Sequence, residues 1–354
     1  MLLEENKLLA PLTTLGVGGP ARWFTEAATE ADIVEAAAWM QENNALLFVL
    51  GGGSNLLVAD AGFNGLVMQI GLKGIERRDE SESVVYRVAA GEDWDHFVQR
   101  AVNDGCAGIE CLAGIPGTVG GTPVQNVGAY GQEVANCIDK VRAYDLSARA
   151  FVEFSAAQCG FAYRRSRFNT VDRGRYVVTR VDYRLKPGGA PTVAYRDLQK
   201  EFAGKSDLGL AEVANAVRRI RRSKGMLLVD GDPDCHSAGS FFKNPIVSEE
   251  QTQAIGRTAG QEPPKFAAGA EGESVRRVKL AAAWLIDQAG FSKGYTRGAA
   301  GISSRHTLAL VNRGEATAAE ILSLADEIAS RVEERFGIRL EREPVLLGFK
   351  EALS

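Results

Sequence analysis

The sequence predicts an α+β fold of two or three lobes. Its 354 residues are more than one domain usually contains, since single domains most often have about 100–150 residues. Segments with the hydrophobic spacing of strands and of helices follow one another along the chain, and glycine-rich loops separate them. Hydrophobic residues make up 45% and charged residues 24%, the balance of a globular protein and not of a disordered, collagen-like or coiled-coil chain.

The first lobe is expected to combine a helix with short strands. Ala31–Glu42 has apolar residues at helical spacing, and Leu46–Leu50 follows as a short apolar strand. Gly51–Asn55 then interrupts the pattern before another strand-like segment at Leu66–Ile70. This order predicts a strand–helix–strand unit with a glycine loop.

The second lobe is expected to begin with the strand Val84–Ala89 and the helix Trp94–Val102. After a long uncharged loop, strands are expected near Val141–Asp145 and Tyr176–Leu185. The turn-rich segment Lys186–Pro191 then predicts either a hairpin or a boundary between substructures.

The last part of the chain predicts a third α+β lobe. Ala211–Arg222 has the pattern of a helix with a basic C-terminal end, and Val278–Ala289 that of a second helix. Thr307–Val311 is strand-like, and Ala316–Phe336 predicts a long amphipathic helix.

Charge and cysteine content exclude several classes of protein. A net charge of −4 provides no general basic field for nucleic acid. Five cysteines without a C-x-x-C pair predict neither a disulfide framework nor a zinc site, so we expect reduced thiols. The histidines His96, His236 and His306 lie too far apart in sequence for a typical metal-binding motif, and no metal is expected.

No targeting segment is expected at the N-terminus, which places two acidic residues before its first lysine and lacks a long apolar core. The longest uncharged stretch, Cys111–Gln132, is long enough to span a membrane, but its many glycines and prolines disfavour a spanning helix. We therefore expect a cytoplasmic protein without a membrane partner.

Two glycine-rich strings could bind a nucleotide. Gly16–Ala21 matches the dinucleotide fingerprint G-x-G-x-x-A, but Pro11, Pro20 and the extended pattern of Ala21–Thr25 exclude the strand–turn–helix context that this fingerprint needs. Gly51–Asn55 directly follows a strand, and its three glycines would let successive N–H groups point at one phosphate.

The run Gly114–Gly131 is unusually long for an uncharged loop. Its small residues, with Thr118, Gln125 and Asn126, suit contact with a large, flat ligand that offers hydrogen-bonding edges. A buried crossover between lobes is the alternative, although it explains the three polar residues less well.

Ser240–Lys243 has the S-x-x-K spacing of penicillin-recognising serine enzymes. The companion S-D-N and K-T-G motifs are absent, so an acylating serine is not expected. Two phenylalanines between the serine and the lysine nevertheless predict a packed, oriented site.

These motifs, together with Tyr163–Phe168, Ala238–Pro245 and Leu340–Glu343, resemble the MurB family of UDP-N-acetylenolpyruvoylglucosamine reductases in type and in order. The resemblance extends over nearly the whole chain. Tyr195–Leu198 resembles the tyrosine-loop insertion of the type I branch of that family.

The resemblance implies three domains. Residues 1–72 would form the first lobe of an FAD-binding module of the p-cresol methylhydroxylase type, to which the C-terminal strand 343–354 would return. Residues 73–215 would form the second lobe, with the tyrosine-loop insertion near 186–200. Residues 216–342 would bind the UDP-sugar.

The resemblance also implies three groups of site residues. The FAD-binding group is Gly51, Gly52, Gly53, Ser54, Asn55, Gly114, Ile115, Pro116, Gly117, Thr118, Gly120, Gly121, Gln125 and Asn126. The substrate-binding group is Tyr195, Arg221, Lys224, Lys243, Asn244 and His306. The catalytic group is Arg164, Ser240 and Glu343, with Glu341 as an alternative to Glu343 because residues two apart on a strand share a face.

The implied reaction is the NADPH-dependent, FAD-mediated reduction of the enolpyruvyl group of UDP-N-acetylglucosamine enolpyruvate to UDP-N-acetylmuramate, a step in peptidoglycan precursor synthesis. Arg164 would stabilise charge on the substrate carboxylate, Ser240 near Lys243 would donate a proton, and Glu343 would help to polarise the carboxylate. The expected partner is the UDP-sugar alone, with a monomeric chain and no nucleic acid.

Two other functions are compatible with parts of this pattern. One is an FAD-dependent oxidase that shares only the flavin module. The other is a regulatory protein that binds flavin or nucleotide without catalysis, in which Arg164, Ser240 and Glu343 would be dispensable.

Overall fold

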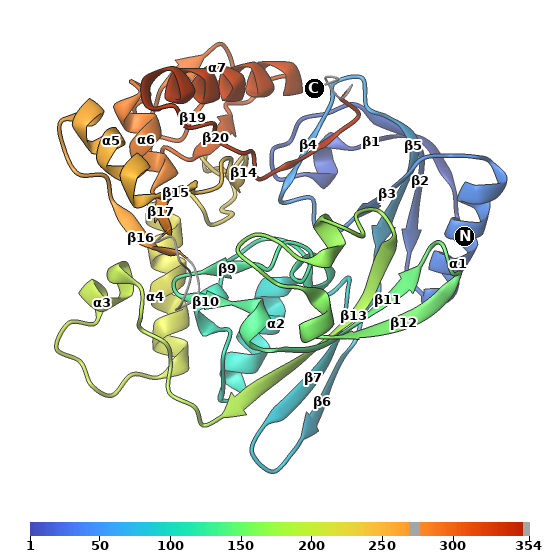
Figure 1. The fold of residues 1–354 in the computed structure, drawn as a ribbon. Helices are drawn as coiled ribbons and strands as arrows, with labels where there is room; N and C mark the ends of the chain where they lie inside the picture. The colour runs from blue at the N-terminus through green and yellow to red at the C-terminus, as the bar shows by residue number, and fades with distance from the viewer. Residues whose placement is uncertain (269–276, 350–354) are drawn as a thin grey trace. The chain divides into compact units, whose positions relative to one another are not determined.

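The computed structural model describes residues 1–268 and 277–349, which form two compact units (Figure 1). Unit 1 comprises Met1–Lys7, Pro20–Gly53 and Phe63–Ser223. Unit 2 comprises Leu8–Gly19, Ser54–Gly62 and the described chain from Lys224 onward. Helices and strands occur in both units, and each has its own buried core, so the predicted α+β class is confirmed.

The first sheet contains the strand–helix–strand pattern predicted near the N-terminus. Its strands, in spatial order, are β1 (Glu4–Leu8), β2 (Pro20–Ala27), β5 (Phe63–Ile70) and β3 (Leu47–Leu50). Both β2 and β3 run parallel to β5, and the helix α1 (Glu30–Glu42) connects β2 to β3. A capping box between Thr29 and Asp32 starts α1, because each side chain accepts a hydrogen bond from the other's backbone N–H.

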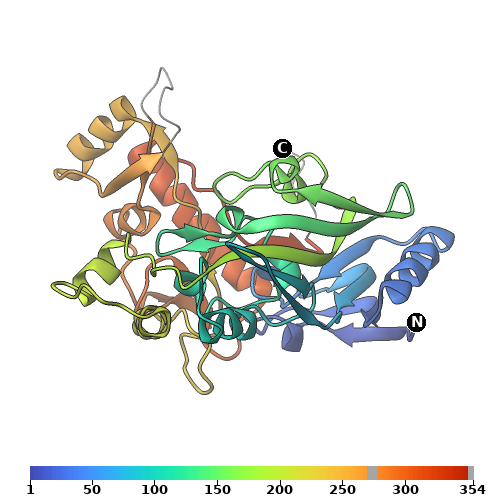
Figure 2. The ribbon, with the colours of Figure 1, turned by 90° about the horizontal axis from the view of Figure 1, so that it is seen from below.

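A larger antiparallel sheet forms the rest of the unit 1 scaffold, and Figure 2 shows its long strands side by side. Its strands, in spatial order, are β12 (Ala150–Ser155), β11 (Ile138–Asp145), β13 (Tyr176–Pro187), β7 (Val84–Ala89) and β6 (Ile75–Asp79), with β8 (Cys106–Ala107) paired to the end of β13. The helix α2 (Trp94–Asn103) contributes Trp94 and Phe97 to a fully buried aromatic cluster with Tyr183 of β13. Ring centroids there lie 5.0–5.8 Å apart, a distance at which tilted aromatic rings attract each other.

Two further helices, one hairpin and several short turns complete the secondary structure of unit 1. They are α3 (Arg196–Glu201), α4 (Leu210–Ser223), the hairpin β9 (Gly128–Ala129) and β10 (Gln132–Glu133), and the 3₁₀ turns η2 (Glu110–Leu112), η3 (Val119–Gly121), η4 (Val134–Asn136), η5 (Ala157–Cys159) and η6 (Arg167–Asn169). The apolar face of α4, with Val213 and Val217, is buried in the unit 1 core.

Unit 2 contains two small antiparallel sheets and one parallel pair. The first sheet, in spatial order, is β14 (Ser237–Ser240), β20 (Ala309–Asn312), β19 (Ala300–Ile302) and β18 (Thr296–Arg297). The second is β15 (Ile246–Ser248), β17 (Arg277–Leu280) and β16 (Lys265–Ala268). The parallel pair is β21 (Val345–Leu347) and β4 (Leu56–Val58).

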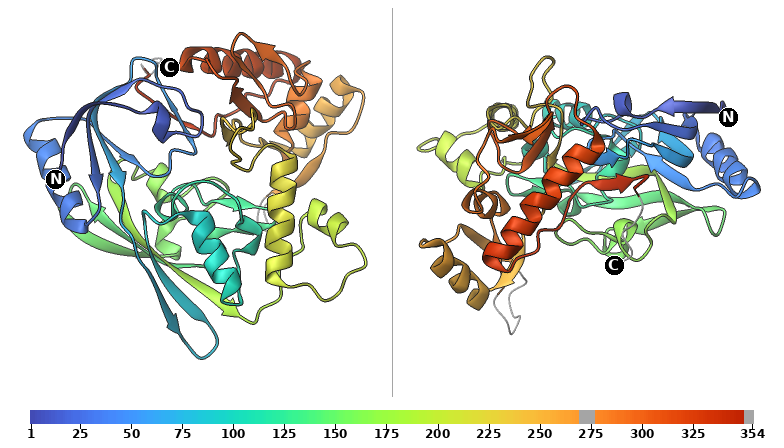
Figure 3. Two further views of the ribbon diagram at one scale, coloured as in Figure 1. Left: turned by 180° about the vertical axis from the view of Figure 1, so that it is seen from behind. Right: turned by 90° about the horizontal axis from the view of Figure 1, so that it is seen from above.

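The helices of unit 2 are α5 (Glu249–Ala259), α6 (Ala282–Gln288) and α7 (Ala318–Phe336), and its first segment contains the short 3₁₀ turn η1 (Ala10–Leu12). The long α7, drawn in red in Figure 3, packs against β19, β20 and α6. Its buried stripe includes Ile321, Leu324 and Ile328, as the amphipathic pattern predicts. No helix among the described residues is long and apolar enough to cross a membrane.

One predicted helix is partly wrong. The pattern of Val278–Ala289 suggested a continuous helix, but Val278–Leu280 belongs to β17 and helix α6 begins at Ala282. The central strand β17 pairs with β15 on one side and with β16 on the other, and these hydrogen bonds hold its backbone extended. Tertiary pairing therefore overrides the local helical spacing at these residues.

The two compact units divide the chain differently from the three expected domains. Within the expected lobe 1–72, Leu8–Gly19 and Ser54–Gly62 join unit 2. The Asp60 carboxylate there accepts hydrogen bonds from the first two N–H groups of α7, and β4 pairs with β21. The C-terminal segment 343–354 was expected to return to the first lobe, and its described strand β21 pairs with residues 56–58, which lie within the range 1–72 expected for that lobe. Residues 350–354 lie outside the described range.

The second boundary also differs. The expected division after residue 215 falls inside α4, and the boundary between the units lies at Ser223 and Lys224 because the apolar face of this helix is buried in the unit 1 core. The five cysteines are free thiols, and all are buried.

Asp145 should make the stability of unit 1 sensitive to acid. The Arg175 guanidinium and the N–H groups of Ser147 and Ala148 lower the pKa of this buried carboxyl to about 2. Because the folded-state pKa lies below the ordinary value of 3.8, its contribution is complete above about pH 4 and is lost as the pH falls towards 2. We expect Asp145→Asn to lower the free energy of unfolding at pH 7 by about 1–2 kcal/mol and to flatten its decline below pH 4, as measured by urea titration.

Candidate functional site

Two glycine-rich loops of unit 1 approach each other closely. A Cβ on Gly52 would lie 2.6 Å from Gly117 Cα, and a Cβ on Gly51 would lie 2.8 Å from Thr118 Oγ1. At Gly52 only glycine permits this approach without displacing the Gly117 backbone, whereas at Gly51 the Thr118 side chain would have to move. The Thr118 hydroxyl is buried and has no hydrogen-bond partner among the described residues. The two loops thus form a backbone-lined cradle with one unsatisfied polar group.

Hydrogen bonds to side chains hold both the N–H and the carbonyl group of Gly114, the first residue of the second loop. The Gly114 N–H donates to Asp95 Oδ1 at 2.6 Å, and the Gly114 carbonyl accepts from Arg221 Nε at 2.9 Å. Arg218, one turn before Arg221 on α4, forms an ion pair with the same Asp95 at 2.7 Å. Burial lowers the pKa of the Arg221 guanidinium, whereas Tyr130 and Asp95 partly oppose that effect. Arg221, expected to contact the substrate, therefore also supports the glycine loop.

The rest of the predicted cofactor-binding loop lies close to unit 1's core. Gly120 passes Ala90 so closely that an added Cβ would lie 2.7 Å from Ala90 Cβ, whereas Gly121 has open space around it. Ile115, Pro116 and Gln125 are half-buried.

Asn126 has a structural function in addition to any contact with a ligand. Its side-chain amide donates to Glu133 Oε2 at 2.8 Å and to the Ala162 carbonyl at 3.1 Å, and its side-chain oxygen accepts from the Ala135 N–H. The side chain thereby joins the hairpin β9–β10 to the turn that follows Ala162.

That turn carries Arg164. Ala162 and Arg165 exchange two backbone hydrogen bonds, so Tyr163 and Arg164 occupy its tip, and Arg164 has a left-handed φ of +55°. The Arg164 guanidinium donates to the Gly128 carbonyl at 3.1 Å. A non-glycine residue in this conformation is strained unless its surroundings hold it, which is common at functional sites.

Tyr195 lies immediately before α3. It occupies the N-cap position of that helix, and its ring packs edge-on against Tyr130 with centroids 5.3 Å apart. Tyr130 itself sits at the tip of the β9–β10 hairpin with a φ of +49°. The Tyr195 side chain therefore packs against the tight turn of the β9–β10 hairpin.

In unit 2 the structure brings Ser240 and Glu343 onto adjacent segments. Phe242 and Arg342 form an antiparallel bridge, and the Glu343 N–H donates to the Phe241 carbonyl at 2.9 Å. Ser240 is the last residue of β14, and the two phenylalanines after it are fully buried. These buried rings fix the segment, as the sequence suggested, whereas Ser240 and Glu343 remain half-buried.

The end of the first glycine loop is attached to the same region. The Asn55 side-chain amide donates to the Glu343 carbonyl at 3.2 Å, and the Asn55 carbonyl accepts from the Val345 N–H. The neighbouring Ser54 carbonyl lies 3.5 Å from the Thr14 hydroxyl, which donates to the Ser237 carbonyl at 2.7 Å. The division between the units falls inside this loop, between Gly53 and Ser54.

Lys243 and Glu341 form an ion pair at 3.2 Å, and the Glu341 side chain is 76% exposed. This exposure and pairing favour Glu343 over Glu341 as the functional carboxyl group. Asn244 accepts a hydrogen bond from the Ala282 N–H and so helps to start α6. Ser240 ends strand β14, and none of residues 240–243 is helical.

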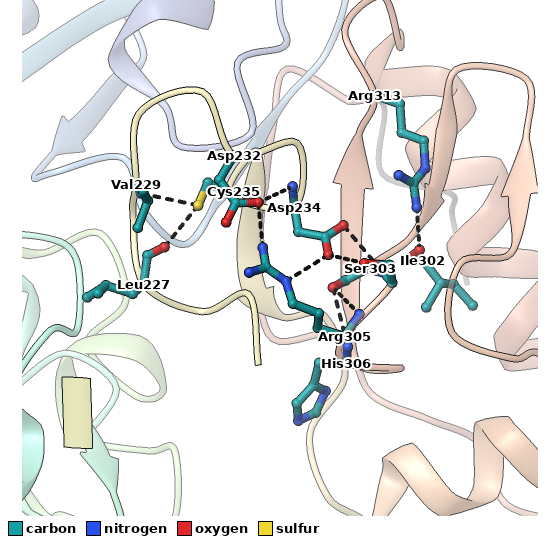
Figure 4. Close-up of polar contacts among 11 residues, drawn as sticks. Leu227, Val229, Asp232, Asp234, Cys235, Ile302, Ser303, Arg305, His306 and Arg313 are labelled. Atoms are coloured by element: carbon teal, nitrogen blue, oxygen red, sulfur yellow. Dashed lines mark hydrogen bonds and ion pairs between the residues drawn. The ribbon is translucent and has the colours of Figure 1, made fainter. Parts of the chain in front are cut away.

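The loop between Lys224 and Ser237 has a defined path in unit 2 (Figure 4). Asp234 accepts hydrogen bonds from the N–H and hydroxyl of Ser304 and from Arg305 Nε, and Arg305 also pairs with Asp232. The Cys235 thiol donates to the Leu227 carbonyl at 2.9 Å (Figure 4). These contacts close the loop onto the segment that carries His306.

His306 is a neutral imidazole in this environment. Burial, followed by the nearby charges of Lys224 and Lys293, lowers its pKa to about 4. Its Nδ1 atom accepts from the Leu308 N–H at 3.1 Å, so the remaining proton is on Nε2 and can be donated. Lys224 and His306, both expected to bind substrate, are thus close enough for the charge of Lys224 to help lower the pKa of His306.

Sequence reasoning missed the supports of these residues. Asp95 and Arg218 hold the glycine loop, yet they lie 123 positions apart in sequence and belong to two different helices. The Asp234–Arg305 pair spans 71 positions. The basic end of the helix near Arg218 and the acidic turn near Asp234 are visible in the sequence. A single sequence contains no signal that pairs these residues with Asp95 and Arg305.

Two protein families match separate parts of the chain. An FAD-binding domain family matches residues 21–149, and the C-terminal domain of UDP-N-acetylenolpyruvoylglucosamine reductase matches residues 232–347. A solved structure of UDP-N-acetylenolpyruvylglucosamine reductase from Thermus caldophilus has a TM-score of 0.65 and 29% identity, and the match covers 98% of this chain and all of that one.

Curated relatives are similar along nearly their whole length. The UDP-N-acetylenolpyruvoylglucosamine reductase of Thermobifida fusca is 46% identical over 97% of this chain and 98% of its own. The corresponding enzyme of Streptomyces coelicolor is 45% identical over 96% of this chain and 89% of its own. Because both ends and both matched domains take part in this similarity, the chain belongs to the family of UDP-N-acetylenolpyruvoylglucosamine reductases.

Proposed function

We propose that this protein reduces the enolpyruvyl group of UDP-N-acetylglucosamine enolpyruvate to give UDP-N-acetylmuramate, with FAD as cofactor and NADPH as the source of electrons. The observation that supports this proposal is the antiparallel bridge between Phe242 and Arg342, which brings together the segments that carry Ser240 and Glu343, in a chain similar to these reductases over nearly its full length. An oxidase sharing only the flavin module is disfavoured because the similarity includes residues 232–347.

The residues of unit 1 fit FAD. The close approach of Gly51 and Gly52 to Gly117 and Thr118 leaves a cradle that a Cβ would fill, and the buried Thr118 hydroxyl lacks a protein partner among the described residues. Backbone N–H groups of a glycine-rich loop and a hydroxyl group suit the oxygens of a pyrophosphate. When bound, FAD supplies hydride transfer from NADPH to the substrate. The second loop from Gly114 to Asn126, together with Ser54 and Asn55, would complete this contact.

Arg164 would act on the carboxylate of the enolpyruvyl group. Addition of hydride to the methylene carbon moves electron density into that carboxylate, and a fixed guanidinium stabilises the charge as it develops. The hydrogen bond to the Gly128 carbonyl and the left-handed backbone hold Arg164 in place before substrate arrives. Its planar fork can make two parallel hydrogen bonds with a carboxylate.

Ser240 and Glu343 would complete the reaction. The carbon next to the carboxylate needs a proton, and the Ser240 hydroxyl is the proposed donor. A protonated or hydrogen-bonded Glu343 would help to polarise the carboxylate, whereas an isolated anion there would oppose the build-up of negative charge.

The sugar nucleotide would contact a group of polar and aromatic side chains. The proposed residues are Tyr195, Arg221, Lys224, Lys243, Asn244 and His306. Lys224 supplies a positive charge for the diphosphate, and the neutral His306 can donate from Nε2 without adding charge. We infer further that the enzyme acts as a monomer in the cytoplasm, in peptidoglycan precursor synthesis, and thereby supports cell shape and division.

Visible absorbance under anaerobic conditions tests the proposed function directly. Addition of NADPH to the purified, FAD-loaded protein should bleach the flavin bands, and addition of UDP-N-acetylglucosamine enolpyruvate should restore them. Bleaching without recovery would mean that the acceptor is misassigned. Rapid recovery with oxygen alone would favour the oxidase, and a flavoprotein inert to NADPH would favour a regulatory protein.

Gly52→Ala should weaken FAD binding about 10- to 100-fold, because the new methyl group would have to displace the backbone at Gly117. Gly209→Ala is the matched control, since Gly209 also lies in unit 1, is not among the proposed FAD-binding residues, and its Cβ would meet nothing within 4 Å. The dissociation constant can be measured by quenching of FAD fluorescence on titration with apoprotein. Equal affinities for the two variants would exclude the close contact of the loops as part of the FAD site.

A further inference from the structure

We propose that Glu110 is a positioning residue that holds Tyr195 in place for binding of the sugar nucleotide. This inference rests on the proposed function, because it takes Tyr195 as a residue that contacts the substrate. Glu110 lies 85 positions before Tyr195 in the sequence, at the start of the turn η2 in unit 1.

Glu110 is a completely buried carboxylate whose two oxygen atoms accept three hydrogen bonds. Its Oε2 atom accepts from the Gly108 N–H at 2.8 Å. Its Oε1 atom accepts from the side-chain amide of Gln132 and from the Thr192 N–H, both at 2.8 Å. Its exposed fraction is 0%. A buried carboxylate is unfavourable unless hydrogen bonds compensate it, so these three donors and the carboxylate depend on one another.

The contact with Thr192 fixes a segment that has no regular secondary structure. Residues 189–194 form neither helix nor strand, so no ladder of backbone hydrogen bonds holds them. Each polar group of Thr192 is instead engaged: its N–H donates to Glu110, its carbonyl accepts from the Cys111 thiol at 3.2 Å, and its hydroxyl accepts from the Gln132 amide at 3.2 Å. Thr192 is thus the anchor of the chain that leads to Tyr195.

A second connection between Glu110 and Tyr195 runs through the β9–β10 hairpin. Gln132 of β10 donates to Glu110, and its side-chain oxygen accepts from the Cys111 N–H at 2.8 Å. Tyr130, at the tip of the same hairpin, packs against the Tyr195 ring. At the neighbouring Gly131, an added Cβ would lie 3.3 Å from Ala194 Cβ. Glu110 therefore fixes both the segment that carries Tyr195 and the surface on which its ring rests.

The chemistry of the carboxylate explains why an amide would not serve equally well. Three N–H groups converge on two oxygens, and a carboxylate can accept from all of them. A glutamine has one acceptor oxygen and one NH₂ group, so in either orientation at least one of the three donors would face another donor. Loss of that bond would release Thr192 or tilt the turn at Gly108, and Tyr195 would sample more positions.

The test compares Glu110→Gln with Asp145→Asn in the FAD-loaded enzyme. Both variants replace a buried carboxylate of unit 1 by its amide and remove hydrogen bonds from backbone N–H groups, so both should lower stability. Only Glu110→Gln should raise the KM for the sugar nucleotide, by about 5- to 30-fold, with kcat and the maximal rate of flavin reduction by NADPH within about twofold of wild type. Glu110→Ala should have a larger effect in the same direction.

A double-mutant cycle with Tyr195→Ala shows whether Glu110 acts through the tyrosine. Tyr195→Ala should raise the KM more than it lowers kcat, and Glu110→Gln should then add almost nothing in the double variant, because the side chain that it positions is gone. Fully multiplicative effects would overturn the proposal. So would an unchanged KM in Glu110→Gln while Tyr195→Ala raises it.

These outcomes also separate this inference from the proposed function. An unchanged KM in Tyr195→Ala would remove Tyr195 from the substrate-binding residues and the role of Glu110 with it, but the two half-reactions seen by flavin absorbance would still stand. An equal rise in KM for Asp145→Asn and Glu110→Gln would mean that general destabilisation is the cause, and would also overturn the positioning role.

Discussion

Replacing Ser240 with alanine is expected to slow reduction of the enolpyruvyl group by about 10²–10⁴-fold, which is the usual contribution of a well-placed proton donor. Flavin reduction by NADPH should remain at its wild-type rate, because that half-reaction requires no proton from this hydroxyl. The substitution removes one oxygen atom from the end of β14 and leaves the buried Phe241 and Phe242 in place, so the fold should be retained.

Rapid mixing of the two half-reactions measures this effect. The reduced enzyme is mixed with the sugar nucleotide, and the return of oxidised flavin absorbance is followed for wild type and variant. Ser237→Ala, on the same strand, is the control, since its hydroxyl accepts from the Gly239 N–H and is assigned no proton transfer. Wild-type reoxidation in Ser240→Ala would exclude Ser240 as the donor.

Arg164→Lys is expected to lower kcat for the same half-reaction by about 10²–10³-fold, the range found when one preorganised donor to a developing anion is removed. Lysine keeps the positive charge but cannot present two parallel N–H groups to a carboxylate, and the substitution would remove the hydrogen bond from the Arg164 guanidinium to the Gly128 carbonyl. The position of the charge, and not the charge alone, is therefore the feature that is tested.

The neighbouring Arg165 provides a matched control for that variant. It belongs to the same turn and is exposed, so Arg165→Lys should leave kcat unchanged. A similar loss in both variants would show that the turn as a whole is sensitive. Near wild-type turnover of Arg164→Lys would show that a bidentate contact with the carboxylate is not needed.

Local patterns in the sequence were sufficient for most secondary-structure elements. The strand Val84–Ala89 and the helices near Ala31–Glu42, Trp94–Val102 and Ala316–Phe336 occur at or within a few residues of their predicted ends. Hydrophobic spacing is a local property, and these segments bury the face that their spacing defines. The strand β17 is the exception, because its neighbours on both sides determine its conformation.

The motifs likewise indicated which residues to propose for the site, but they did not indicate which of these segments lie together in the folded chain. Glycine strings at Gly51 and Gly114 indicated close backbone contacts, and the structure pairs Gly52 with Gly117. Ser240 and Glu343 lie 103 positions apart in sequence, and only the antiparallel pairing at Phe242 and Arg342 brings their segments together. Spacing along a chain carries no information about such pairings.

The sequence by itself determined the family, the positions of the glycine loops and the proposed site residues, because each is recognised from a short contiguous stretch of sequence. Tertiary structure alone decided which side chains support these loops and residues. Asp95 and Arg221 hold Gly114, Asp234 pairs with Arg305 in the loop before β14, and Glu110 holds Thr192 in the segment that leads to Tyr195. The physical reason is that buried polar groups must find partners wherever the folded backbone brings donors and acceptors together, and those partners are distant in sequence.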